Sequence, residues 1–419
     1  MSDMSSMNRE NKKKQLKRQI VRPEPAGVYT ADKEEEAREA MKRARKRRRN
    51  IRLGILAFLL VTGIGLYQFS KYYQYTDYTT VWETSIGEGS VTAYENFGSN
   101  VLKYTKDGAA YIDNKGKTVW VVSYEMKNPV AVVQGDYAAV ADLQGNQIYI
   151  CNTSGCTGTA ATLLPISKVT VAGNGVTSAV LEDNKGSYIT YYNKDGTALD
   201  ISITDRMGST GYPMDISLSP DGKQLIVSYS YVEKGELLNR VIFYDFSEIG
   251  KNIPTRIVGG FDETFGSSMV PRVRYLSDVY SCAFSDNGIA FFSSENLKSP
   301  QLVKQVTVEE EIQSVMYSEK YVGIIVDTTA GEMPNRMDIY KINGDKVFSE
   351  EFDYQYIHAD IDGERVILYN EDSCKVYNMS GVEKFSSQLD IQVNKITTGS
   401  FPNTLILTGT QTMKEIKLQ

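Results

Sequence analysis

The sequence predicts an all-β domain, a β-propeller, that is exported on a single membrane-spanning helix. Three observations lead to this fold class. A run of bases at residues 43–49 stands just before an uncharged apolar segment at residues 53–69. After that segment, short runs rich in Val, Ile, Tyr and Thr alternate with turn sequences such as Pro-Asp-Gly and Asn-Gly. These runs recur about every 43 residues, which is the spacing of four-stranded propeller blades.

The N-terminal tail, residues 1–52, is basic, with 17 Lys/Arg against 8 Asp/Glu. Its first 30 residues contain few apolar side chains, which is typical of disorder. Residues 31–50 favour a helix, because acidic residues such as Glu39 precede a base, here Arg43, by four positions. This helix could regulate or bind a partner. The simpler interpretation is a topology signal that also contacts anionic lipid headgroups.

The apolar segment at residues 53–69 is predicted to be a transmembrane helix. A secretory signal peptide would end in a cleavage site of small residues, whereas this segment ends in Tyr67, Gln68 and Phe69. We therefore expect an uncleaved, single-pass anchor in the cell membrane. Basic flanks stay in the cytoplasm, so the N-terminus is expected there. A linker at residues 70–79 then leads to an extracytoplasmic propeller at residues 80–419.

The part of the chain after the tail is acidic. Residues 53–419 contain 29 Lys/Arg and 44 Asp/Glu. Nucleic-acid binding needs concentrated positive charge, so nucleic acid is not expected as a partner. A domain of this length can bury a large core without disulfide bonds.

Four cysteines are few for an exported chain. Cys151 and Cys156 flank the turn-forming sequence Asn-Thr-Ser-Gly and could face each other across a hairpin. A disulfide and two separate thiols are both compatible with this spacing. Cys282 and Cys374 lie in apolar surroundings and are expected to be buried.

The propeller repeats are visible as a series of apolar first strands. The clearest unit, residues 217–228, reads Ser-Leu-Ser-Pro-Asp-Gly-Lys-Gln-Leu-Ile-Val-Ser. It resembles the strand–turn–strand signature of WD40-like and TolB-like propellers, a resemblance that implies a fold and no activity. The layout as a whole resembles an uncharacterised bacterial family of membrane-anchored propellers, a domain of unknown function. The first strands are expected to begin near residues 90, 129, 168, 214, 279, 312, 355 and 392.

Eight blades and a closed ring follow from the strand count. The last repeat offers only three strands, at residues 392–398, 404–408 and 412–418, before the chain ends. A fourth is available at residues 80–86, and pairing it with the last strand would remove two exposed sheet edges. Seven blades are the alternative, because blade five, residues 279–308, is poorly defined. Quinoprotein propellers are similar in blade count, but their tryptophan repeats are missing here.

Three long connections fall on the face opposite to the one where the chain enters the propeller. They span residues 230–239, 259–278 and 327–336. Long loops in a compact repeat fold are often functional, and aromatic residues mixed with arginine are typical of interaction surfaces. The second connection could instead pack on itself over the channel. The candidate interaction surface comprises Phe261, Asp262, Glu263, Phe265, Arg272, Arg274, Tyr275, Glu332 and Arg336.

The sequence indicates no catalytic residue, no cofactor and no metal site. Asp262 and Glu263 would suit a hydrolase only at a carboxylate separation that sequence does not give. The single histidine, His358, is expected in a core strand. We therefore expect a non-enzymatic scaffold or protein-interaction module of a bacterial cell envelope, bound to an envelope protein or polymer. The alternatives are a sensor or ligand-binding domain that signals through the tail, and an extracytoplasmic hydrolase.

Overall fold

The computed structural model describes residues 31–86, 93–205, 210–328 and 331–419, and the chain divides into two compact units, Met1–Ser70 and Lys71–Gln419. Helix α2 (Ala31–Tyr72) joins the predicted tail helix and the predicted span into one element. Its stretch Arg38–Tyr72 is long and apolar enough to cross a membrane. The predicted pair of Glu39 and Arg43 is present at 2.8 Å. The tail at residues 1–30, expected to be disordered, lies outside the described residues.

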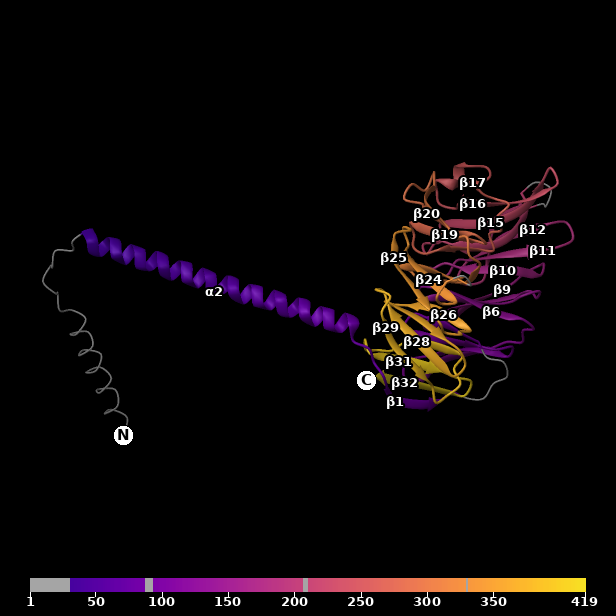
Figure 1. Cartoon of the computed structure of the whole chain (residues 1–419). Coiled ribbons are helices and arrows are strands. Elements are labelled where there is room, and N and C mark those ends of the chain that lie inside the picture. The colour runs from indigo at the N-terminus through magenta and orange to yellow at the C-terminus, as the bar shows by residue number, and fades with distance from the viewer. Residues whose placement is uncertain (1–30, 87–92, 206–209, 329–330) are drawn as a thin grey trace, which may run out of the picture. The chain divides into compact units, whose positions relative to one another are not determined.

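The second unit contains eight antiparallel sheets of four strands each, which confirms the predicted eight-bladed propeller (Figure 1). In seven blades the strands follow one another along the chain. The eighth blade combines the last three strands with the first one, in the order β1-β32-β31-β30.

The first four blades run from residue 93 to residue 266. Blade one contains β2 (Ala93–Phe97), β3 (Asn100–Tyr104), β4 (Gly108–Ile112) and β5 (Thr118–Ser123). Blade two contains β6 (Pro129–Gln134), β7 (Tyr137–Asp142), β8 (Gln147–Asn152) and β9 (Gly155–Ala161). Blade three contains β10 (Ile166–Val171), β11 (Thr177–Glu182), β12 (Ser187–Tyr192) and β13 (Ala198–Asp205). Blade four contains β14 (Tyr212–Leu218), β15 (Gln224–Glu233), β16 (Glu236–Asp245), the short 3-10 helix η1 (Gly250–Asn252) and β17 (Ile257–Gly266).

The other four blades complete the ring. Blade five contains β18 (Arg272–Tyr275), β19 (Tyr280–Ser285), β20 (Gly288–Ser293) and β21 (Gln301–Thr307). Blade six contains β22 (Ile312–Tyr317), β23 (Tyr321–Asp327), β24 (Asn335–Lys341) and β25 (Lys346–Phe352). Blade seven contains β26 (His358–Asp362), β27 (Arg365–Tyr369), β28 (Ser373–Asn378) and β29 (Glu383–Gln388). Blade eight contains β30 (Lys395–Thr398), β31 (Thr404–Thr408), β32 (Thr412–Leu418) and β1 (Tyr78–Ser85).

The hydrophobic core is divided among the gaps between neighbouring blades. Within the described residues there are eight apolar clusters, and each joins two adjacent blades. Second strands such as β7 and β23 are buried almost throughout, whereas outer strands such as β5 alternate between exposed and half-buried residues. This decrease in burial from second to outer strands explains why second strands have continuous apolar sequences and outer strands have alternating ones. Since none of these eight clusters lies within one blade, no blade is expected to be stable alone.

The ring closes where β1 pairs with β32, from Tyr78 opposite Leu418 to Ser85 opposite Thr412. Figure 1 shows β1 beside the yellow C-terminal strands. The Trp82 indole donates a hydrogen bond to Glu415 of β32 at 2.8 Å. The predicted closing strand is therefore confirmed, and it begins two residues earlier than expected.

A buried charge supports this closure. The Lys414 side chain on β32 is completely buried and forms an ion pair with Asp390, in the connection between β29 and β30. The same Asp390 carboxylate accepts a hydrogen bond from the Tyr78 hydroxyl of β1 at 3.0 Å. One carboxylate thus links the first strand of the propeller to the last.

Two predicted details of blades four and five are wrong. The strand expected near residue 279 is the second strand of blade five, and the first is β18 at Arg272–Tyr275. Residues 259–278, expected as one long loop, are mostly the strands β17 and β18, which leaves only residues 267–271 as their connection. Pro271 and two arginines make β18 difficult to recognise as a strand from the sequence. Its polar side chains belong to an inner strand that borders a water-accessible channel, so the usual apolar signal is missing.

Other predicted boundaries hold to within a few residues. The start near residue 90 lies outside the described residues, and β2 begins at Ala93. The connection at residues 230–239 extends the hairpin, since β15 and β16 pair out to Glu233 and Glu236. The connection in blade six is confirmed between Asp327 and Asn335.

We expect Asp390→Ala to lower the free energy of unfolding by about 2 kcal/mol, because it leaves the buried Lys414 ammonium without its carboxylate. Adding Lys414→Met to this variant should recover most of the loss, since the uncompensated charge is then removed. Urea denaturation of the full-length protein measures both. A double variant as unstable as Asp390→Ala would contradict this role for the ion pair.

A second prediction concerns Asp205 at the end of β13. This carboxyl group is buried and accepts a hydrogen bond from the Tyr229 hydroxyl at 2.9 Å. Burial raises its pKa from 3.8 to about 6, against the smaller opposing effect of the Tyr229 hydrogen bond. Because the pKa is higher in the folded state, the protonated group stabilises the fold at low pH. This contribution is lost as the pH rises from about 4 to about 6.

The Asp205→Asn variant has a neutral side chain at every pH, so it does not lose this stability as the pH rises. We expect the variant to be more stable than the wild type at pH 7.5 by about 2 to 3 kcal/mol, and the difference to shrink by roughly half at pH 5. Thermal unfolding at both pH values tests this, with Asp136→Asn at an exposed turn as the control. A difference that does not depend on pH would contradict the raised pKa of Asp205.

Candidate functional site

The antiparallel order of each blade determines which loops share a face. One cavity is lined by the first residues of β2, β18, β22 and β26 and by the last residues of β19 and β27. The ends of these strands therefore meet at one face, which we call the mouth face. It carries the connections between blades and the loops between second and third strands. The opposite face, where β1 begins, is called the base face.

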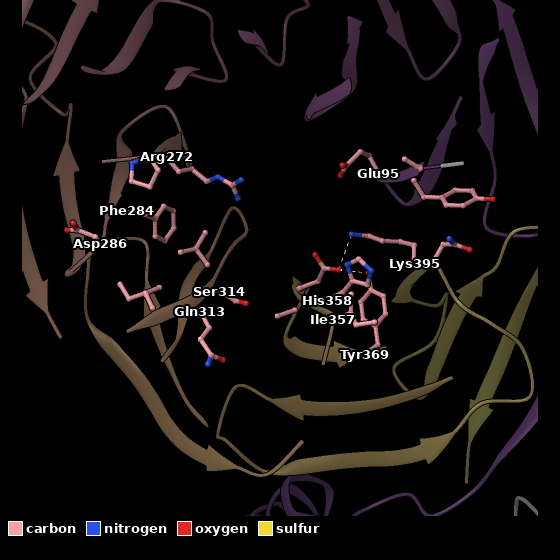
Figure 2. A pocket seen from close by; sticks show the side chains of 18 of the residues that line it. Glu95, Arg272, Phe284, Asp286, Gln313, Ser314, Ile357, His358, Tyr369 and Lys395 are labelled. Atoms are coloured by element: carbon pink, nitrogen blue, oxygen red, sulfur yellow. Dashed lines mark hydrogen bonds and ion pairs between the residues drawn. The ribbon is translucent and has the colours of Figure 1, made fainter. Parts of the chain in front are cut away.

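The channel at the mouth face opens into a cavity of about 880 Å³ (Figure 2). Its walls come from blade one and from blades five to eight. This volume lies within the range of small-molecule binding sites, roughly 300 to 1,000 Å³. The lining is mixed in character, with charged groups beside aromatic and aliphatic side chains, so the cavity suits a ligand that is both polar and apolar.

An ion pair occupies one wall of the cavity. Lys395 Nζ lies 3.0 Å from Asp360 Oδ2, which also accepts a hydrogen bond from the Tyr369 hydroxyl at 3.0 Å. Burial alone would lower the pKa of Lys395, but the carboxylates of Asp360 and Glu95 outweigh it and raise this pKa. Lys395 therefore remains an ammonium group, and the pair is a fixed part of the wall.

His358 lies at the mouth of this cavity. The sequence suggested a core position, but the residue is the first of β26 and is exposed. Its ring stacks on Tyr369 with the two centroids 4.9 Å apart. Burial lowers the pKa of His358, Asp360 raises it and Lys395 lowers it, with a net downward shift. The imidazole is neutral at pH 7.

Two further charged groups, Glu95 and Arg272, border the cavity from blade one and blade five. Figure 2 shows both side chains extending into the open space. Burial, the largest effect, raises the pKa of Glu95, while Lys395 and Arg272 lower it in part. Of the residues selected from the sequence, Arg272 is the one that borders this cavity.

The structure does not gather the predicted interaction surface in one place. On β17, Phe265 is buried, Phe261 packs beside it, and Asp262 and Glu263 are exposed. Asp262 lies 3.8 Å from Arg240.

The remaining predicted residues lie on other elements. On β18, Arg274 pairs with Asp215 at 2.7 Å, and the buried Tyr275 hydroxyl donates to Gln224 at 2.9 Å. In blade six Glu332 is exposed in the connection after β23, whereas Arg336 on β24 pairs with Glu310 at 2.6 Å. Burial and internal ion pairs thus account for several of these side chains.

Two of the cysteines lie in the hairpin of β8 and β9. Cys151 and Cys156 are opposite each other in this hairpin and form a disulfide bond. Cys282 and Cys374 are buried thiols, as expected.

The mouth face carries exposed apolar side chains that no sequence pattern groups together. Val232 and Leu237 are directly paired across the projecting hairpin of β15 and β16, and they are 60 % and 54 % exposed. At the base face the described residues include Phe401 and, at the end of β22, Tyr317. The other exposed apolar residues of the mouth-face connections are Leu163, Met269, Met333 and Ile357.

Comparison with known proteins identifies a family whose profile matches this sequence. The sequence profile of a family of unknown function, DUF5711, matches residues 71–418. The chain belongs to this family. The match begins at Lys71, where the second unit of the structure also begins, so the DUF5711 region comprises the propeller and the segment leading into it. The resemblance in layout to a family of unknown function is thereby confirmed. No curated protein matches the sequence.

Several solved structures are similar to the DUF5711 chain. BamB from Moraxella catarrhalis is 11% identical, with 82% of this chain and 100% of that chain covered and a TM-score of 0.49. The Dos1 propeller is 10% identical, with 83% and 97% covered and a TM-score of 0.48. The Pan2 WD40 domain from Neurospora crassa is 11% identical, with 82% and 95% covered and a TM-score of 0.42.

The electrostatics of the cavity can be tested on His358, the single histidine of the chain. One imidazole resonance of histidine-labelled protein, purified without a histidine tag, reports its pKa, which we expect to be below 6.5. Asp360→Asn should lower this pKa further and Lys395→Met should raise it, since each removes one neighbouring charge. Lys346→Met, outside the cavity, is the control. A pKa that moves in neither variant would rule out this arrangement of charges.

Proposed function

We propose that the propeller is a protein-interaction module and that its mouth face binds the partner. The observation that carries this proposal is the adjacent pair of exposed apolar side chains, Val232 and Leu237, on a hairpin of that face. A single exposed apolar residue is ordinary, but adjacent exposed apolar residues favour an interaction site. The paired Val232 and Leu237 at a projecting hairpin are suited to insertion into a partner. No catalytic role is proposed.

We further propose that α2 spans the cell membrane, with the N-terminus in the cytoplasm and the propeller outside. The stretch Arg38–Tyr72 is long and apolar enough to span, and the bases at residues 43–49 favour a cytoplasmic tail. The partner would then be a protein or polymer of the cell envelope.

The way the chain enters the propeller supports this arrangement. The Lys71 carbonyl accepts a hydrogen bond from the Asn378 side chain at 3.0 Å. The Tyr75 backbone N–H donates to the Lys384 carbonyl at 2.8 Å and forms a parallel bridge with Phe385. These partners lie at the end of β28 and the beginning of β29, near the base face. The chain therefore enters the propeller at the base face, away from the mouth-face connections.

Site-specific photo-crosslinking in intact cells tests the proposal. A photoreactive residue is placed at Val232 or Met333 on the mouth face, or at Phe401 on the base face, all of which are exposed. We expect the two mouth-face positions to capture the same protein and Phe401 to capture none of it. Capture at Phe401 alone, or at no position, would overturn the proposal.

A charge placed in the apolar pair gives an independent test. Leu237→Asp should reduce capture at Met333 by at least about tenfold, because an unpaired carboxylate is costly in a dry interface. Val121→Asp, on the exposed outer strand β5, is a control of similar exposure. Both variants should unfold at the wild-type temperature, which separates lost binding from lost folding. Equal capture in both variants would contradict the role of the hairpin.

A further inference from the structure

Two charged side chains of opposite sign face the cavity without a partner in the described parts of the chain. The Glu95 carboxylate is partly buried, and it makes no hydrogen bond or ion pair with those residues. The Arg272 guanidinium is likewise unpaired there. They belong to blades one and five, which are opposite each other in a ring of eight. Figure 2 shows them extending toward the cavity from its two sides.

Two other charged groups around the channel, Lys395 and Arg274, are paired within the protein. Lys395 pairs with Asp360 at 3.0 Å, and Arg274 pairs with Asp215 at 2.7 Å. A partly buried carboxylate without a direct ion-pair partner is unfavourable, and burial raises the pKa of Glu95 although Lys395 and Arg272 lower it in part. A cationic group placed beside Glu95 would relieve this cost. An anionic group placed beside Arg272 would use donors that the protein itself leaves free.

We propose that the channel mouth binds a small zwitterion of the short-peptide class, with its ammonium group on Glu95 and its carboxylate on Arg272. The guanidinium fork matches the two oxygens of a carboxylate. One carboxylate suits an ammonium group better than a metal ion, which requires several ligands. The described residues accordingly contain no group of three or more metal-ligating side chains. The cavity of about 880 Å³ has room for a peptide of several residues.

The stacked rings of His358 and Tyr369 provide a flat wall against which the apolar part of such a peptide can lie. This site differs from the proposed protein-interaction surface, because it depends on charged side chains inside the channel mouth, and of the exposed apolar residues named above only Ile357 borders both. It goes beyond the proposed function and stands even if no protein binds the loops.

Alanine peptides of two to four residues provide the probe. Each is used with free ends, with an acetylated N-terminus, with an amidated C-terminus and with both ends blocked. Binding to the full-length protein is followed by the resonance of His358, the single histidine, in the cavity wall. We expect saturable shifts from at least one peptide with free ends. Blocking either end of that peptide should weaken binding at least about tenfold.

Two variants test which side chain binds each end of the peptide. Glu95→Gln should abolish the difference between free and acetylated peptides, and Arg272→Gln the difference between free and amidated ones. Glu319→Gln, at an exposed turn of the base face, is the control. Neither variant should affect crosslinking at Val232, so failure here is distinguishable from failure of the proposed function. Equal shifts from free and doubly blocked peptides, or no shift at about 10 mM peptide, would overturn the proposal.

Discussion

The pairing of β1 with β32 is the constraint on which the rest of the propeller depends. Every described apolar cluster lies between two blades, so each blade needs both neighbours to cover its faces. The cluster between blades eight and one is small, with Tyr94, Val101, Ile112, Ile406 and Met413 as its buried members. Closure therefore relies strongly on main-chain pairing and on the polar links of Trp82 to Glu415 and of Tyr78 to Asp390.

Closure also makes the two faces structurally different. Because β1 is an outermost strand, the incoming chain is attached at the base face, where the adjoining ends of β28 and β29 bind it. The mouth face then carries the channel opening, the projecting hairpin of β15 and β16, and the long connection in blade six. The ring also brings Glu95 and Arg272, which are far apart in sequence, to opposite sides of one cavity.

Much of this fold could be predicted from the sequence, because its turns are local signals. Turns such as Pro220-Asp221-Gly222 mark the hairpin between the first two strands of a blade, and residues 80–86 could be assigned to closure because blade eight lacked a strand. Blade five was misplaced by one strand, since β18 combines Arg272 and Arg274 with a preceding proline. That strand faces the channel, where polar side chains are tolerated and the hydrophobic pattern fails.

The candidate site was far less predictable. Its side chains lie near the ends of strands from five blades, and only the closed ring brings them together. No short motif links Glu95, Arg272 and His358, and the sequence suggested that His358 lay in the core. Several residues selected as an interaction surface are instead internal, since Phe265 and Tyr275 are buried and Arg274 is paired with Asp215. An aromatic and charged composition alone does not distinguish a blade interface from a binding surface.

Backbone hydrogen exchange in the full-length protein, read by mass spectrometry, tests ring closure most directly. If β1 completes blade eight, amides of β1 that bond to β32 exchange as slowly as those of the buried strand β31, despite their distance in sequence. If β1 exchanges as fast as an exposed turn while β31 remains protected, this strand does not close the ring. The assignment of the base and mouth faces would then also be wrong.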